Sequence, residues 1–180
     1  MPRRLTTPDL ADDVVRLEPL ARALAPEMRW VIEPDPDIAA FTYIPTRPAD
    51  GFLEHWLGRY EDGWWTGERA GFALRIDGEA LGFAAFVKLD LEQHEGEIGY
   101  VVARAARGRG AATRAVRLLT DWGFAGLGLQ RIELRIDAQN EASERVAERA
   151  GYEKEGVLRN LAFKEGLRKD VSIWSRVSHL

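Results

Sequence analysis

A short segment rich in arginine and glycine carries the clearest chemical signal in this sequence. No acidic residue occurs between Glu97 and Asp121. Five arginines fall there instead: Arg104, Arg107, Arg109, Arg114 and Arg117. Gly108 and Gly110 allow positive φ angles and let a ligand come close to the main chain. The segment is therefore suited to bind an anion.

The same segment joins a predicted strand to a predicted helix. Residues 100–102 are β-formers, and apolar residues recur at helical spacing between Ala112 and Trp122. Free N–H groups and the helix dipole favour an anion at the start of a helix. We predict a phosphate site here. A glycine turn on a solvated basic surface is the competing interpretation.

Two known phosphate-binding loops do not match these residues. A P-loop needs Lys followed by Ser or Thr after its second glycine, whereas Ala111 and Ala112 stand there. A dinucleotide-binding fingerprint needs a third glycine where Thr113 stands, and an acidic residue about 20 positions later that has no clear candidate. The segment must belong to another class of phosphate site.

A different motif does fit. Arg107, Gly110 and Ala112, after a strand that carries Gly99 and Tyr100, resemble the acyl-CoA-binding motif of the GCN5-related N-acetyltransferases (GNAT). Residues 98–102 and the loop through residue 113 are most similar to the RimJ/RimL branch. That branch acetylates protein N-termini and a variety of small amines.

A second motif begins at Asn140. Because Asn is a favoured N-cap, Asn140 followed by Ser143 is, taken alone, a helix cap. The same family carries an Asn-x-x-Ser element that ends in a basic residue, a glycine and an aromatic residue, and Arg149, Gly151 and Tyr152 complete that pattern here. The resemblance follows the element order over residues 14–174, while its motifs are confined to residues 97–114 and 140–152.

The resemblance implies acetyl-CoA as the co-substrate. The loop main chain is implied to bind the pyrophosphate, with arginine side chains adding charge. The implied cofactor-binding residues are Tyr100, Val102, Arg107, Gly108, Arg109, Gly110, Ala112, Thr113, Asn140 and Ser143. In the family the pantetheine arm pairs with the strand before the loop, so the Val102 N–H is expected to polarise the thioester carbonyl. We expect Arg107→Glu to weaken coenzyme A binding with little loss of stability.

Acetyl transfer to an amine also needs a base, because an α-amine has a pKa near 8. Glu97, on the predicted strand before the loop, is the candidate base. The competing interpretation makes Glu97 and Glu95 exposed residues that balance nearby arginines. The family pattern implies that Ser143 protonates the leaving thiolate. The family often uses a tyrosine for this step, and Tyr152 is not clearly in that place.

Length and composition fit one compact domain, residues 1–180, with 46% hydrophobic and 30% charged residues. The net charge of −4 argues against a nucleic-acid or anionic-membrane partner. Without cysteine, and with His55, His94 and His179 scattered, neither an acyl-cysteine intermediate nor a metal site is expected.

The chain has neither a long apolar run nor a leader-like N-terminus, so we expect a cytoplasmic protein. An exposed final strand near the C-terminus is compatible with a homodimer.

Periodicity predicts an α/β (α+β) fold, which the resemblance also implies: a mixed, mostly antiparallel sheet of about seven strands flanked by helices. Strands are expected at residues 13–17, 71–76, 81–89, 97–102, 131–136, 152–158 and 171–177. Helices are expected at residues 20–32 with a break at Pro26, 49–61, 111–122 and 140–150. Residues 34–48 are expected to form loops, and Gly63 to end the second helix. One of Trp64 and Trp65 is expected to fill the core, and His55 to be exposed.

We therefore interpret the chain as an acetyl-CoA-dependent N-acetyltransferase that works by direct transfer in a ternary complex. The acceptor is a protein N-terminus or a small amine. Two other classes stay open at this point: a non-catalytic acyl-CoA sensor or interaction module on the same fold, and a nucleotide- or RNA-binding protein that uses the arginines.

Overall fold

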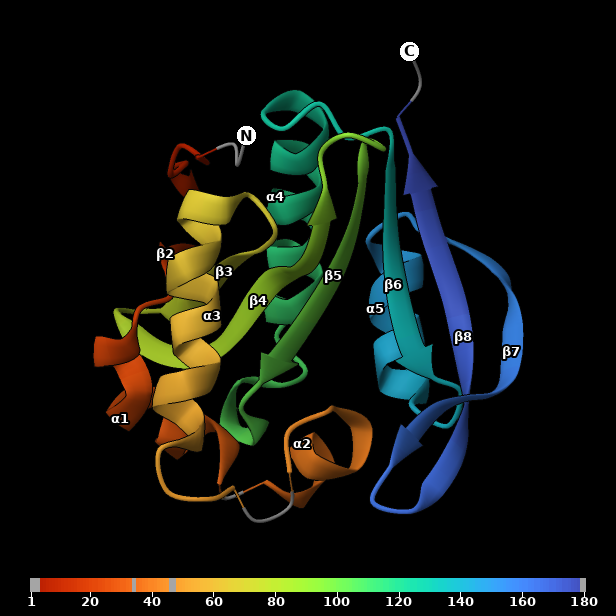
Figure 1. Cartoon of the computed structure of the whole chain (residues 1–180), viewed down its shortest axis with the longest axis horizontal. Helices are drawn as coiled ribbons and strands as arrows, with labels where there is room; N and C mark the ends of the chain where they lie inside the picture. Colours follow the sequence, from red (N-terminus) through yellow and green to blue (C-terminus); the bar gives the residue numbers. More distant parts are fainter. Residues whose placement is uncertain (1–3, 34, 46–47, 179–180) are drawn as a thin grey trace.

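The computed structural model describes residues 4–33, 35–45 and 48–178 of the 180-residue chain. Eight strands form one sheet in the order β1-β2-β3-β4-β5-β6-β8-β7 (Figure 1). The strands are β1 (Leu10–Ala11), β2 (Arg16–Pro19), β3 (Ala70–Ile76), β4 (Glu79–Asp90), β5 (Glu95–Val102), β6 (Arg131–Asp137), β7 (Glu153–Lys164) and β8 (Leu167–Val177). The helices are α1 (Ala25–Ile32), α2 (Pro36–Phe41), α3 (Phe52–Thr66), α4 (Ala111–Ala125) and α5 (Glu141–Arg149). Neighbouring strands are antiparallel except β5 and β6, which run parallel.

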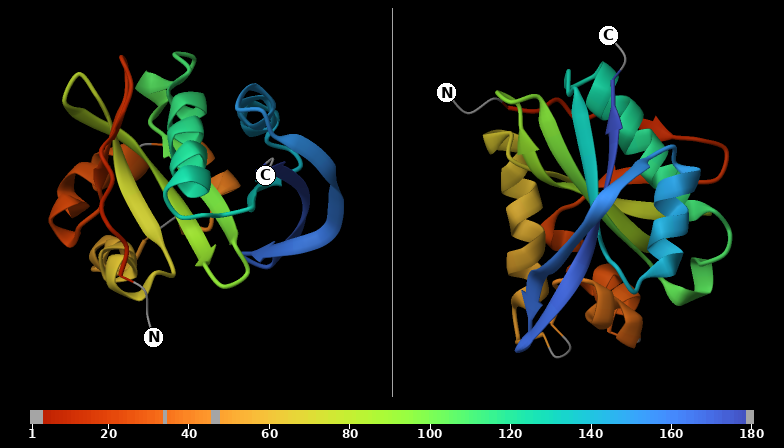
Figure 2. Two further views of the ribbon diagram at one scale, coloured as in Figure 1. Left: turned by 90° about the horizontal axis from the view of Figure 1, so that it is seen from above. Right: turned by 90° about the vertical axis from the view of Figure 1, so that its right-hand side faces the viewer.

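Helices cover both faces of the sheet and give the molecule three layers (Figure 2). On one face Leu119 of α4 shares a buried cluster with Phe86 and Ile98 of the sheet. On the other face Leu57 of α3 shares a second cluster with Val101. Successive side chains of a strand point to opposite faces, so β5 presents its even-numbered residues to α4 and its odd-numbered residues to the α3 side.

The sheet is open between β5 and β6. These strands pair at three positions only: Glu95 with Arg131, Gly96 with Ile132, and Glu97 with Glu133. β5 stays paired with β4 up to Val102, and β6 stays paired with β8 along its whole length. Residues 98–102 therefore have no strand partner on the β6 side (Figure 1). We call this gap in strand pairing the β5–β6 opening.

The predicted fold class is confirmed, with one strand more than expected because the two-residue β1 carries no periodic signal. The predicted break at Pro26 is also confirmed: a 3₁₀ turn at Arg22–Leu24 precedes α1, and Pro26 lies in its first turn. β5 begins at Glu95 rather than at residue 97. β7 and β8 both extend beyond the predicted ranges and meet in a hairpin.

The predicted stop of α3 at Gly63 is wrong. The helix continues through Trp64 and Trp65 to Thr66 and ends at Gly67, which has a φ of 76°. A Cβ atom on Gly63 would come within 2.6 Å of the Arg69 carbonyl oxygen, so this glycine permits close packing instead of ending the helix. Trp64 packs on the core as one of the pair was expected to, whereas Trp65 is exposed.

The proline-rich segment holds a short helix that was predicted to be loop. The Asp35 carboxylate caps α2 by accepting the Asp37 N–H at 3.0 Å, and Pro36 lies in the first turn. Pro36 thus begins a helix instead of excluding one. Pro34 and His179 lie outside the described residues, and His55 is exposed as expected.

Within the described part of the chain, no helix is both long and apolar enough to span a membrane. The expectation of an exposed final strand is wrong, because β8 lies between β6 and β7, and the edge strands of the sheet are β1 and β7.

Candidate active site

The loop after β5 leads directly into the N-terminus of α4. Gly108 and Gly110 both have a φ of 78°, and Gly110 is the N-cap residue. A Cβ atom at either glycine would meet nothing within 4 Å, so glycine is required here by the backbone conformation and not by packing. Among the described residues no side chain caps α4, and its first turn contains no acidic residue. The first N–H groups of α4 and the positive end of its dipole are therefore available to an anion.

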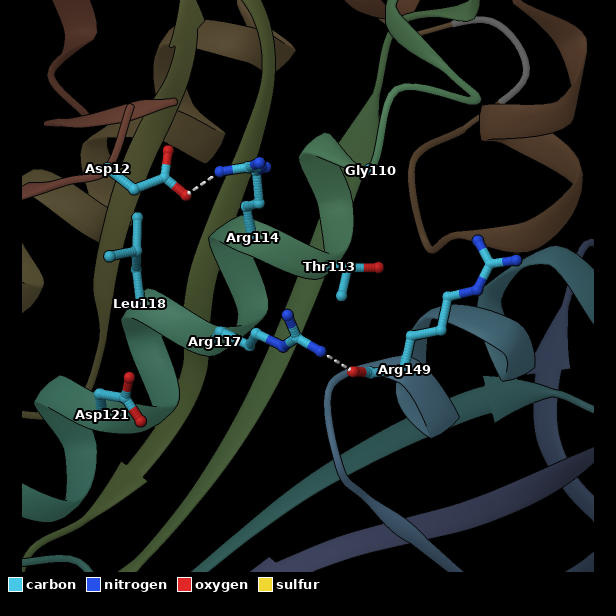
Figure 3. Close-up of a pocket in the computed structure, with 8 residues that line it drawn as sticks. All are labelled: Asp12, Gly110, Thr113, Arg114, Arg117, Leu118, Asp121 and Arg149. Carbon is cyan, nitrogen blue, oxygen red and sulfur yellow. Dashed lines mark hydrogen bonds and ion pairs between the residues drawn. The ribbon is translucent and has the colours of Figure 1, made fainter. Parts of the chain in front are cut away.

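A hollow of about 510 Å³ lies beside this helix start (Figure 3). Gly110 and Thr113 of the first sequence motif line it together with Arg149 of the second. Its other lining residues are Asp12, Arg114, Arg117, Leu118 and Asp121. Two motifs that are separate in sequence thus meet at one site, whose size lies in the range of small-molecule sites.

The arginines around this hollow differ in what they contact. Arg114 Nη1 lies 2.8 Å from Asp12 Oδ2 and 2.5 Å from Asp13 Oδ1, while Arg117 donates to the Arg149 carbonyl. Within the described residues the guanidinium of Arg149 makes no hydrogen bond or ion pair. Part of the positive charge is thus offset inside the protein, and part stays available to a ligand.

Arg107 faces away from the start of α4 and towards α2. Its Nη2 lies 2.5 Å from Asp35 Oδ2, its Nη1 lies 3.1 Å from Asp37 Oδ2, and its Nε donates to the Val102 carbonyl at 3.0 Å. The Arg107 N–H donates to the Arg104 carbonyl at 3.3 Å. The Arg107 side chain was expected to contact the phosphate. In this structure it connects the loop to α2 instead.

α2 is held on the other side of the β5–β6 opening by the β7–β8 hairpin. Lys169 Nζ donates to the Ala40 carbonyl at 2.8 Å and lies 2.6 Å from Asp137 Oδ2 at the end of β6. Lys164 Nζ donates to the carbonyls of Thr42 and Ile44 at 2.7 Å. With Arg107 on one side and these lysines on the other, α2 spans the end of the opening (Figure 1).

The unpaired edge of β5 offers main-chain groups to the opening. Ala103 N–H donates to the Leu81 carbonyl of the β4 side at 2.8 Å. Because main-chain groups alternate sides along a strand, those of Tyr100 and Val102 face the opening. The Val102 carbonyl accepts from Arg107 Nε. The Val102 N–H points to the same side of the strand as this carbonyl, and therefore into the opening. An extended chain that contains amides can pair with such an edge.

A hydroxyl pair connects β5 to α5 on the α4 side of the opening. The Tyr100 hydroxyl lies 2.6 Å from Ser143 Oγ, and burial raises the pKa of Tyr100 to about 12. Asn140 Oδ1 accepts the Ser143 N–H at 3.1 Å, so the cap interpretation of Asn140 matches the structure. The sequence motif indicates a role for the main chain of Tyr100 only. Strand alternation, which points this side chain to the α4 face, was the signal that could have identified it.

Tyr152 is outside this arrangement. It is buried, and its hydroxyl lies 2.7 Å from Thr120 Oγ1 of α4. Its hydroxyl is paired with Thr120, so the hydroxyls next to the opening are those of Ser143 and Tyr100.

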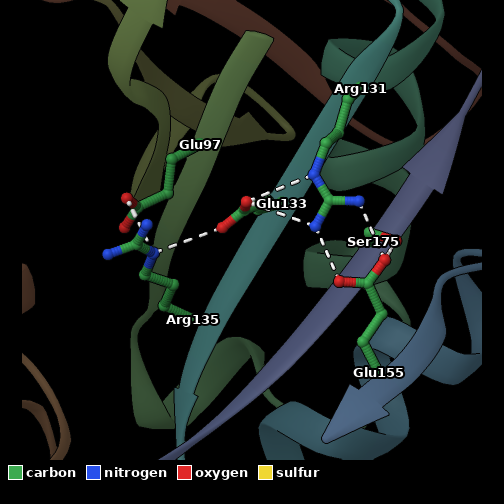
Figure 4. Close-up of polar contacts among 6 residues, drawn as sticks. All are labelled: Glu97, Arg131, Glu133, Arg135, Glu155 and Ser175. Carbon is green, nitrogen blue, oxygen red and sulfur yellow. Dashed lines mark hydrogen bonds and ion pairs between the residues drawn. The ribbon is translucent and has the colours of Figure 1, made fainter. Parts of the chain in front are cut away.

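Glu97 lies on the α3 side of the sheet, opposite Tyr100 and Ser143. Its side chain is 25% exposed, and its carboxylate lies 3.4 Å from Arg135 Nε (Figure 4). Burial raises the pKa of Glu97, Glu133 raises it further, and Arg135 and Lys88 lower it. Glu95, by contrast, is exposed at the start of β5.

The arrangement combines the groups that acyl transfer requires. The helix start can hold an anion, and the strand edge can hold an extended amide chain. A carboxylate lies on one face of the sheet and a hydroxyl on the other, both on or next to the strand that borders the opening. Among the described residues, no group of His, Asp or Glu side chains is arranged as a metal site, and the expected absence of a metal stays a prediction.

Comparison with known proteins connects this geometry to a family. Residues 15–153 match a family model described as an acetyltransferase (GNAT) domain. An uncharacterised N-acetyltransferase, p20 of Bacillus licheniformis, is 36% identical over 97 residues, which are 54% of each chain. Spermidine N(1)-acetyltransferase of Escherichia coli K12 is 28% identical over 152 residues, covering 84% of this chain and 80% of that protein. The chain thus spans about half of the first relative and most of the second.

Solved structures share the whole fold. The microcin C7 self-immunity acetyltransferase MccE, determined with acetyl-CoA and AMP, superposes with a TM-score of 0.87 at 21% identity over 96% of this chain and 98% of that chain. RimL, a ribosomal L7/L12 α-N-protein acetyltransferase determined with coenzyme A, superposes with a TM-score of 0.85 at 16% identity over 92% and 95%. At these identities the likeness concerns the fold.

Proposed function

Because this chain belongs to the GNAT family of acetyltransferases, we propose that it moves an acetyl group from acetyl-CoA to a primary amine by direct transfer in a ternary complex. The observation that carries the proposal is the β5–β6 opening, which borders the uncapped N-terminus of α4. The acceptor is a protein N-terminus or a small-molecule amine. RimL and the spermidine acetyltransferase represent these two acceptor classes among the similar proteins.

In this proposal the N–H groups of residues 108–113, including those of Arg109 and Ala112, bind the diphosphate of acetyl-CoA. The nucleotide end of the molecule fills the hollow lined by Thr113 and Arg149. The pantetheine arm lies along β5, where it pairs with the main chain of Tyr100 and Val102, and Asn140 Nδ2 donates to the arm. Positioning of the two reactants accounts for much of the rate enhancement in such a bimolecular transfer.

The transfer itself uses groups from both faces of the sheet. The amine nitrogen attacks the thioester carbonyl, and its proton passes through a chain of waters to the Glu97 carboxylate, which lies on the same strand as Val102. The Val102 N–H stabilises the negative charge that develops on the carbonyl oxygen. The C–S bond then breaks, and the Ser143 hydroxyl gives its proton to the departing thiolate while it takes up a proton from water. No covalent acyl-enzyme forms, in keeping with a chain that lacks cysteine.

An acetylation assay tests this proposal. Purified protein is incubated with acetyl-CoA and a panel of primary amines that contains spermidine and peptides with free N-termini, and released thiol is measured. We expect at least one amine to be acetylated, and Glu97→Gln to lower kcat by about 100-fold or more at neutral pH. Glu95→Gln is the matched control, because Glu95 is an exposed carboxylate on the same strand.

Other outcomes would contradict the proposal. Acetyl-CoA binding without acetylation of any amine would favour the sensor or interaction module. Displacement of coenzyme A by RNA would favour a nucleic-acid partner.

The homodimer and the cytoplasmic location stay predictions.

A further inference from the structure

Two carboxylates face each other at the point where β5 and β6 separate. Glu97 and Glu133 are partners in the last residue pair between the strands, and both side chains lie on the α3 side of the sheet. Like charges on directly opposite strand positions repel, and neighbouring carboxylates favour uptake of a proton by one of them. A nearby positive charge must offset this repulsion if Glu97 is to be deprotonated.

Arg135 lies between the two carboxylates. Its Nε is 3.4 Å from Glu97 Oε2 and 3.3 Å from Glu133 Oε2 (Figure 4). Glu133 has a second cation, because Arg131 Nη2 lies 3.2 Å from Glu133 Oε1. Glu97 has no second ion pair among the described residues. Removal of Arg135 would therefore affect Glu97 more than Glu133.

The remaining groups around Glu97 do not replace Arg135. Lys88 of β4 is an exposed cation that lowers the Glu97 pKa less than Arg135 does. Tyr60 of α3 is buried, and its pKa is raised to about 12, so it is neutral at physiological pH. Glu133 of β6 carries the same charge as Glu97.

We propose that Arg135 is a positioning residue for acetyl transfer, which holds the Glu97 carboxylate as an anion at the start of the β5–β6 opening. This inference rests on the proposed function, in which Glu97 takes the proton of the amine. Arg135 also links β5 to β6 where their main-chain pairing ends, so one side chain fixes both the charge and the place of the base.

The pH dependence of kcat/KM tests the inference, with Arg135→Gln compared with wild type and with Arg131→Gln. Glu97 acts as a base only when it is deprotonated, so activity falls as pH decreases through its pKa. Without Arg135 that pKa rises, and the acid limb moves to higher pH by about 1 unit. At pH values below the acid limb, kcat/KM of Arg135→Gln is therefore about tenfold lower than that of wild type. At alkaline pH Glu97 is deprotonated in both proteins, and the difference disappears.

Arg131→Gln is the matched control. Arg131 occupies the same face of β6 and pairs with Glu133 and with Glu155 at 2.7 Å, but it does not contact Glu97. We expect its acid limb to move less than half as far. Arg135→Lys keeps a cation and should restore most of the wild-type profile, which separates the effect of charge from a folding defect.

A direct titration gives a readout independent of turnover. The carboxyl ¹³C signal of Glu97, assigned by its absence in Glu97→Gln, is followed against pH in wild type, Arg135→Gln and Arg131→Gln. The inference predicts a higher midpoint in Arg135→Gln, and a shift less than half as large in Arg131→Gln. An unchanged midpoint, or an equal loss of activity at every pH, would overturn it. If Glu97→Gln keeps full activity although the titration shifts, the base assignment in the proposed function is wrong, while the effect of Arg135 on Glu97 stands.

Discussion

The Arg107 side chain connects the loop before α4 to a buried carboxylate. Asp35 is 4% exposed, and Arg107 Nη2 lies 2.5 Å from its Oδ2. Loss of one partner from a buried ion pair leaves an uncompensated charge. Asp35 also caps α2, so the pair fixes the helix that spans the end of the β5–β6 opening.

Arg107→Met should therefore destabilise the protein, in contrast to the small effect expected from the sequence. Because the Arg107 side chain is 38% exposed, we expect a loss of about 2 kcal/mol, below the value for a fully buried pair. Urea unfolding measures this change. The control is Arg109→Met, an exposed residue of the same loop that should leave the unfolding free energy within about 0.5 kcal/mol of wild type. Equal stabilities for the two variants would show that the Arg107 pair contributes nothing.

At the scale of elements, the start of α4 depends on a glycine. Gly110 has positive φ and open space around its Cβ position, as does Gly128 after the other end of the same helix. Alanine at either position introduces the strain of a left-handed conformation, about 1 kcal/mol. Only at Gly110 would the added methyl group stand beside the proposed diphosphate site.

Gly110→Ala should thus weaken coenzyme A binding, while Gly128→Ala should not. We expect Kd to rise about tenfold or more for Gly110→Ala, which corresponds to about 1.4 kcal/mol. Isothermal titration calorimetry measures Kd, and thermal unfolding verifies that both variants lose similar stability. A Kd unchanged in Gly110→Ala would place the diphosphate elsewhere.

The elements differ in how far the sequence determines them. α4 was predictable because its apolar residues recur at helical spacing and glycines precede it. α2 was not, because prolines are compatible with both loops and first helical turns. The end of α3 was misplaced because a glycine can serve close packing as well as termination, and only the position of Arg69 distinguishes the two at Gly63.

The candidate site shows the same division. Two motifs predicted a common site, and the structure brings Gly110, Thr113 and Arg149 to one hollow. The partners of Arg107 and Arg135 could not be predicted, because Asp35 and Glu97 approach them only through tertiary packing and strand register. Local pattern identifies residues of a site, while long-range contacts decide what their side chains do.

At the scale of the whole molecule, the sheet is open near its middle, where β5 and β6 pair at three positions only. The β5–β6 opening joins the helix start to both faces of the sheet, so that one extended ligand could contact Gly110 and Val102 together. A ligand that binds only the folded state also stabilises it, by about 2.7 kcal/mol at a concentration of 100 Kd.

Amide hydrogen exchange with and without acetyl-CoA tests this central claim most directly. If acetyl-CoA pairs with the unpaired edge of β5 and with the start of α4, the amides of Tyr100, Val102 and residues 108–113 should exchange more slowly in its presence. The amides of β7, at the far edge of the sheet, should change much less and provide the internal control. Saturating acetyl-CoA that leaves the exchange of both segments unchanged would contradict the proposed site.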